Sequence, residues 1–115
     1  MIIIAGQIDL ADDRRRDEVV AGSVPFQAAT REEEPGCLAY CFAADPVVAG
    51  RIQVYELWRE EASLNAHFNH PNYLQMRDFL RTAGLKAADN RKYRCDLAKP
   101  VYDSSRVARA DFDHD

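Results

Sequence analysis

The chain has 115 residues, of which 47% are hydrophobic, so it can bury the core of one domain and is too apolar for a disordered chain. Its 19 acidic and 15 basic side chains give a net charge of −4, which argues against a general binder of nucleic acid or anionic membranes. The three cysteines show no CxxC spacing or zinc pattern, so we expect reduced thiols in the cytoplasm. No basic region precedes the apolar residues 2–4 and no apolar run approaches the length of a membrane span, so we expect neither a signal peptide nor a transmembrane segment.

The amino-terminal part of the chain predicts one strand followed by one helical stretch. Residues 2–9 are short and rich in β-branched side chains, which predicts a strand. Residues 12–33 are charged, with apolar positions recurring every four residues, which predicts a helix that Asp12 can cap. Because Gly22 and Pro25 interrupt this pattern, we expect a kink or a split there.

The middle of the chain predicts a hairpin followed by two short helices. Residues 37–44 and 51–58 read as strands joined by about six residues, a spacing typical of a hairpin. Residues 60–68 predict a helix that breaks at residues 69–71 and restarts, with Asn69 as the cap and Pro71 in the first turn.

The last part of the chain predicts one further strand and a tail. The helix restarted at Pro71 runs to residue 82, Gly84 ends it, and residues 85–89 predict a connection. Residues 91–98 predict the fourth strand, whereas the polar residues 103–115 predict a frayed tail beyond a domain of residues 1–102. The order βαββαβ predicts a ferredoxin-like α+β fold with a four-stranded antiparallel sheet and both helices on one face.

The second and third strands carry apolar residues on both sides. In the second strand, one side holds Leu38, Tyr40 and Phe42, and the other holds Cys37, Ala39 and Cys41. Because helices cover only one face, the other face needs a different cover. We therefore expect a homodimer packed sheet to sheet, which would form a dimeric α/β barrel.

Residues 55–73 hold the most informative side chains. His67 shares a helical face with Leu64 and Phe68, which predicts an apolar environment near Trp58. A lone histidine on such a face is more often a core residue than a functional one. Glu56 lies on the face of Trp58, and a buried carboxylate needs a partner; pairing with an arginine is favoured over catalysis.

Signatures of cofactor sites are missing from the sequence. No GxGxxG, P-loop or GxSxG motif is present, and nothing indicates flavin or haem, so we predict no cofactor. His67 and His70 have HxxH spacing, but His70 lies at the predicted helix junction and is expected to face solvent. We therefore predict no metal site.

Four segments resemble the antibiotic biosynthesis monooxygenase family of dimeric α/β-barrel proteins: Glu34-Pro35-Gly36-Cys37-Leu38-Ala39-Tyr40, Tyr55-Glu56-Leu57-Trp58, Leu64-Asn65-Ala66-His67 and Pro71-Asn72-Tyr73. The resemblance implies a monooxygenase that oxidises a quinol, an anthrone or a similar small aromatic substrate with O2, without metal or flavin. It implies His67 as the base, with Trp58, Asn65 and Tyr73 as hydrogen-bond donors. The residues expected to contact the substrate are Tyr40, Phe42, Glu56, Phe68 and Phe79.

Two other functions remain open at this stage. The same features fit a non-enzymatic dimeric domain that binds a small ligand. They also fit an isomerase of a small phosphorylated signalling molecule, although the scattered arginines assign no phosphate site. Haem degradation, known among relatives with this fold, is disfavoured because Gln7, His67 and Arg77 stand where the resemblance would require other residues.

Overall fold

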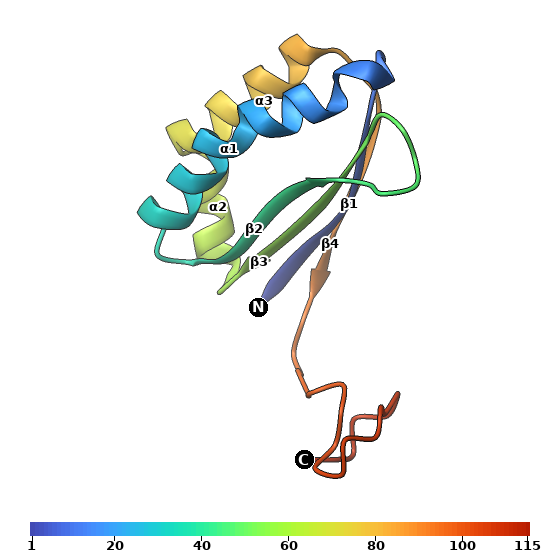
Figure 1. The fold of residues 1–115 in the computed structure, drawn as a ribbon. Coiled ribbons are helices and arrows are strands. Elements are labelled where there is room, and N and C mark those ends of the chain that lie inside the picture. Colours follow the sequence, from blue (N-terminus) through green and yellow to red (C-terminus); the bar gives the residue numbers. More distant parts are fainter.

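A computed structural model describes all residues, 1–115, and has the predicted ferredoxin-like α+β fold (Figure 1). One antiparallel sheet has the strand order β2-β3-β1-β4, and the helices lie on one of its faces. The elements are β1 (Ile2–Leu10), the 3₁₀ turn η1 (Asp13–Arg15), α1 (Arg16–Glu33), β2 (Cys37–Ala44), β3 (Arg51–Trp58), α2 (Glu61–Phe68), α3 (Pro71–Ala83) and β4 (Leu85–Arg94). No helix is both long and apolar enough to cross a membrane.

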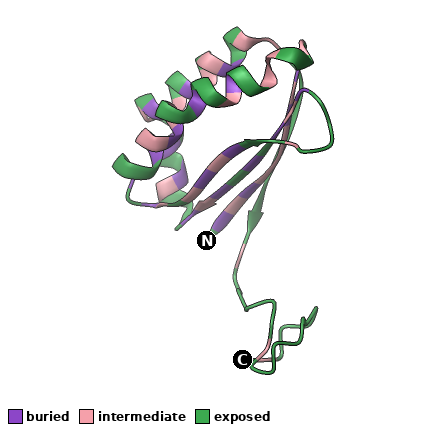
Figure 2. Cartoon of the chain, viewed as in Figure 1, coloured by how far each residue is buried: buried purple, intermediate pink, exposed green.

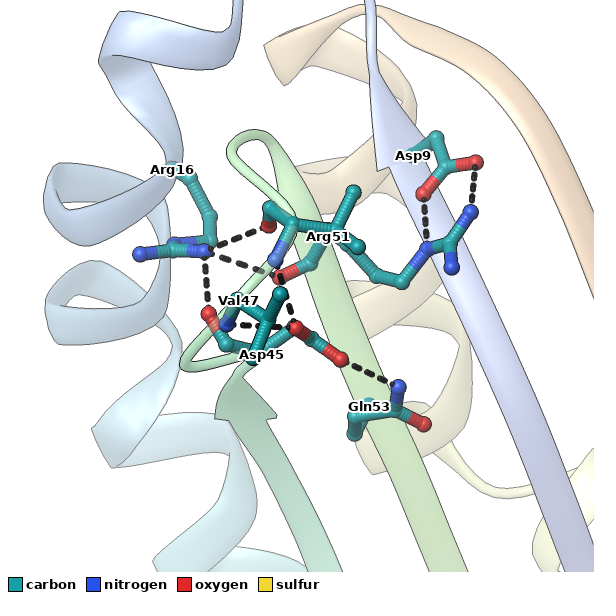
Figure 3. Close-up of polar contacts among 7 residues, drawn as sticks. Asp9, Arg16, Asp45, Val47, Arg51 and Gln53 are labelled. Atoms are coloured by element: carbon teal, nitrogen blue, oxygen red, sulfur yellow. Dashed lines mark hydrogen bonds and ion pairs between the residues drawn. The ribbon is translucent and has the colours of Figure 1, made fainter.

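The β2–β3 hairpin is fixed at its loop by polar contacts (Figure 3). One Asp45 carboxylate oxygen accepts two loop backbone N–H groups at 2.7 and 2.8 Å, and the other accepts the Gln53 amide at 2.7 Å. Arg16 of α1 donates to the Asp45 carbonyl at 2.8 Å, and Arg51 pairs with Asp9 of β1 at 2.8 Å. The loop is therefore tied to both the helix layer and the neighbouring strand.

Strand register places one row of side chains across the whole sheet beneath the helices. Tyr40 lies opposite Glu56, Glu56 lies opposite Ile4, and Ile4 lies opposite Lys92. The row therefore runs from an aromatic residue on β2 to a cation on β4. A bulge in β2 makes Leu38 an extra residue, so it is exposed instead of sharing the face of Tyr40, and that expectation was wrong.

Of the predicted kink or split in the first helix, the split is wrong, because α1 runs unbroken from Arg16 to Glu33. Pro25 has no N–H to donate to the carbonyl four residues earlier, but both Pro25 and Ala21 are exposed, so water can satisfy that carbonyl. Gly22 serves packing: a Cβ there would meet the ring of Phe79 on α3 at 2.8 Å.

The fourth strand begins six residues earlier than predicted, at Leu85 instead of residue 91, and ends at Arg94. Gly84 adopts φ +88°, which ends α3 and turns the chain directly into the sheet, leaving no room for the predicted connection. All ten residues of β4 are exposed in the single chain, and this polar edge strand lacks the apolar alternation by which strands are recognised.

The residues beyond β4 run away from the sheet and are mostly exposed (Figures 1 and 2). They are not simply frayed, as the polar composition predicted. Tyr102 and Ala108 form an isolated β-bridge, and Asp103 accepts backbone hydrogen bonds from Ser105 and Val107 at 2.9 and 3.0 Å. The tail therefore contains one hydrogen-bonded turn.

The sheet face opposite the helices is uncovered in the single chain (Figure 1). Tyr55 is 44% exposed and Tyr93 is 52% exposed, while Leu57 and Ile3 are half-buried on the same face. The single chain therefore leaves open the face for which the sequence predicts a second copy of the chain as the cover.

Candidate active site

A cavity of about 520 Å³ lies between the sheet and the helices α2 and α3. Its volume falls in the usual range for small-molecule sites. Tyr40, Phe42, Phe68 and Tyr73 provide aromatic walls. The sheet row described above supplies the floor through Ile4 and Glu56, and His67 enters from α2.

His67 is hydrogen-bonded to Glu34, the residue that follows α1. The distance from His67 Nδ1 to Glu34 Oε1 is 2.9 Å, and the residues are 1% and 7% exposed. The Asn72 amide donates to the other carboxylate oxygen of Glu34 at 3.3 Å. When Nδ1 donates to this carboxylate, the imidazole proton lies on Nδ1 and the lone pair lies on Nε2.

Aromatic rings surround the imidazole of His67. Its centroid lies 4.4 Å from that of Trp58, 5.6 Å from Tyr40 and 5.4 Å from Tyr73. Burial lowers the pKa of His67, and the hydrogen bond and charge of Glu34 oppose that shift. The imidazole is therefore neutral near pH 7 and can accept a proton at Nε2.

Glu56 is the second buried acid of the cavity, and its partner is an indole instead of the expected arginine. Trp58 Nε1 donates to Glu56 Oε1 at 3.0 Å, and no cation pairs with Glu56. Burial raises the pKa of Glu56 to about 7; the Trp58 hydrogen bond lowers it, and the charge of Glu34 raises it further. Near neutral pH this carboxyl can therefore hold or release a proton.

The cavity brings together most of the predicted site residues, but three lie elsewhere. Trp58 is fully buried, and its N–H is already used by Glu56, so it cannot donate to a substrate as expected. Asn65 is exposed and lies outside this cavity, in a neighbouring depression. Phe79 packs on Phe26 at 5.2 Å, between α1 and α3. Tyr73 is the one predicted donor that lines the cavity.

The sequence reasoning assigned Glu34 no role in the site and named it only within a segment that carries the family resemblance. The one local signal was an acidic residue directly before Pro35-Gly36, and its partner lies 33 positions away in the chain. His70 is the N-cap of α3, accepting the Asn72 N–H at 3.0 Å, where Asn69 had been expected. No cluster of His, Cys, Asp or Glu side chains could hold a metal ion.

Comparison with solved structures shows the fold. A crystal structure from Deinococcus radiodurans, provisionally named an antibiotic biosynthesis monooxygenase, matches 88% of this chain and 98% of its own with a TM-score of 0.72 and 22% identity. A Caulobacter crescentus structure with the same provisional name matches 85% of this chain and 90% of its own, with a TM-score of 0.73 and 17% identity.

Comparison of sequences shows the family. Uncharacterized protein sll1783 from Synechocystis is 35% identical over 72 residues, which are 63% of this chain and 48% of that protein. The chain therefore spans about half the length of this curated relative. The model of the antibiotic biosynthesis monooxygenase family matches residues 1–78, which include the sheet row from β2 to β1, Glu34 and His67. The chain belongs to the antibiotic biosynthesis monooxygenase family.

Proposed function

We propose that the protein is a monooxygenase that oxidises an anthrone, a quinol or a similar aromatic compound with O2. The observation that carries this proposal is the buried Glu34–His67 pair at the wall of an aromatic cavity. Glu34 holds the imidazole in the tautomer that leaves Nε2 free to act as a base, and no residue of the chain donates a hydrogen bond to Nε2. The aromatic walls suit a flat substrate.

For an anthrone the reaction balances with these residues and O2 alone. His67 Nε2 takes a proton from the CH2 group, and the resulting carbanion gives one electron to O2. Recombination of the two radicals forms a C–O bond, and the proton on His67 returns to the peroxide. Loss of the remaining C–H proton to His67 then breaks the O–O bond and yields a ketone. The departing hydroxide takes a proton from Glu56 and leaves as water, and transfer of the second substrate proton from His67 to Glu56 restores both groups.

The test is oxygen consumption by the purified protein with a panel of anthrones and quinols, compared with the uncatalysed autoxidation of each compound. His67→Ala is expected to lower turnover by about 10²–10⁴-fold. His70→Ala is the matched control, because its side chain caps α3 and does not line the cavity. A folded His67→Ala protein that keeps full activity would contradict the role of His67. No turnover of any compound by the wild-type protein would contradict the function.

We also propose that the protein is a homodimer packed through the uncovered sheet face. Support comes from Tyr55 and Leu57, apolar side chains of that face with no cover within the chain. Light scattering is expected to give twice the chain mass at micromolar concentration. Leu57→Lys should shift the mass toward one chain, whereas Val24→Lys, on the exposed side of α1, should not. A wild-type monomer would refute this assembly.

A further inference from the structure

The edge of the cavity is cationic, although the chain as a whole carries a net charge of −4. The lining includes four basic residues, Arg77 and Arg81 from α3 and Arg91 and Lys92 from β4, of which Arg91 points its side chain to the opposite face of the sheet. Glu56 is the only acidic residue of the lining, and with a pKa of about 7 it is partly neutral near pH 7. The charge of the cavity is therefore opposite in sign to that of the protein.

Two of these four cations have no ionic partner within the chain. Arg77 pairs with Asp78 at 3.1 Å, and Arg91 pairs with Asp89 at 3.2 Å. The side chains of Arg81 and Lys92 form neither a salt bridge nor a hydrogen bond with any residue. Both are exposed, so an anionic group could reach them without leaving water completely.

Strand register sets the distance between the acid–base end of the cavity and its cationic end. Glu56, Ile4 and Lys92 are neighbours on three adjacent strands and point to the same face. Two interstrand spacings separate Glu56 from Lys92, about 10 Å at the backbone. A two-ring aromatic compound spans much of that distance, and the side chain of Ile4 offers it an apolar surface.

We propose that the natural substrate is an aromatic acid, whose carboxylate or phosphate group binds Arg81 and Lys92 while its ring lies toward His67 and Glu56. This proposal rests on the proposed function, since it assumes that the cavity binds an aromatic substrate. Charge-assisted hydrogen bonds hold an anionic group at the cationic edge of the cavity and thereby orient the ring. The aromatic walls alone cannot fix this orientation.

The test measures binding, not turnover, with three probes in isothermal titration calorimetry without oxygen. The probes are 1-naphthol, 1-hydroxy-2-naphthoate and 1-naphthyl phosphate, which share a ring system and differ in charge. At least one anionic probe is expected to bind about tenfold more tightly than 1-naphthol, as one partly solvated charge-assisted hydrogen bond would give. The better anion tells whether a carboxylate or a phosphate is preferred. This preference should shrink between about 20 mM and about 500 mM salt.

The double variant Arg81→Gln and Lys92→Gln should remove the preference, so that neither anionic probe binds more tightly than 1-naphthol. Lys86→Gln is the matched control, because it removes one positive charge from β4 outside the cavity lining. Equal binding of all three probes by the wild-type protein would overturn the proposal and leave the proposed function standing. A preference that survives in the double variant would overturn the assignment to these two cations. If none of the probes binds, the aromatic cavity of the proposed function fails as well.

Discussion

The hydrogen bond between Glu34 and His67 should make a large contribution to the stability of the fold. Both side chains are buried, and the acceptor is a carboxylate at 2.9 Å. A hydrogen bond to a charged group contributes about 1.5–3 kcal/mol, and either partner left alone costs the desolvation of a buried polar group. We therefore expect a coupling energy of about 1.5–3 kcal/mol between the two side chains in a double-mutant cycle.

The cycle consists of His67→Ala, Glu34→Ala and the double variant, each unfolded in urea at pH 8 and at one protein concentration. His67→Ala alone should cost about 3–5 kcal/mol, because it also removes a ring packed 4.4 Å from Trp58. Glu34→Ala should cost less, since it removes no ring. The double variant should be more stable than the sum of the two losses implies, because neither partner is left unpaired.

A remote pair provides the control for the cycle. Combining His67→Ala with Gln53→Ala, in the distant hairpin, should give losses that add within about 0.5 kcal/mol. If the Glu34 and His67 variants are equally additive, the two side chains do not interact as their geometry implies. The assignment of the imidazole tautomer through Glu34 would then lose its physical basis.

Three further predictions test other parts of the structure. The folded chain keeps the Glu56 proton up to about pH 7, whereas the unfolded chain releases it near pH 4.5. The protonated Glu56 therefore stabilises the fold at low pH, and this part of the free energy of unfolding is lost as the pH rises from about 4.5 to about 7. The Glu56→Gln variant has no such proton to lose, so its free energy of unfolding in urea should rise by about 3 kcal/mol relative to that of wild type over this pH range. Parallel plots of the two unfolding free energies against pH would contradict this prediction. Burial raises the pKa of Cys37 to about 11, so little of its reactive thiolate is present at pH 8 and Cys37 should react slowly with a thiol-labelling reagent. Cys37→Ser should therefore leave the fast phase of labelling at pH 8 unchanged. A Cβ at Gly6 would collide with the backbone of β4, whereas one at Gly84 meets nothing within 4 Å and costs only the strain of φ +88°, so Gly6→Ala should lower the melting temperature more than Gly84→Ala.

How far the sequence predicted each element depended on the strength of the local pattern. Residues 37–44 and 51–58 were predicted with the observed bounds, because alternating apolar residues there flank a clear turn. β4 was misplaced because its residues, Leu85–Arg94, are polar and exposed along an edge. The predicted split at Gly22 and Pro25 does not occur because Ala21 and Pro25 face solvent, where the lost hydrogen bond is cheap.

The candidate site was predictable only where one element determined it. Helical periodicity placed His67 on an inward face, and strand alternation placed Glu56 beside Trp58. The pairing of His67 with Glu34 depends on how the end of α1 meets α2, which no local pattern encodes. The indole N–H of Trp58 was expected to donate to the substrate. In the packed structure it donates to Glu56 instead, and no local sequence pattern indicates that hydrogen bond.

The composition of the buried polar cluster supports the proposed acid–base role, because an apolar cluster in its place would be a cheaper way to stabilise the fold. Glu34, Glu56, His67 and Asn72 are each less than a tenth exposed, and no lysine or arginine neutralises either acid. Burying carboxylates without cations destabilises a fold, and apolar side chains of similar size would pack in the same space at less cost. Glu56 in particular interrupts an apolar strand face whose other members are Ile52, Val54 and Trp58. Such a departure from the apolar pattern is what a cavity for acid–base chemistry requires.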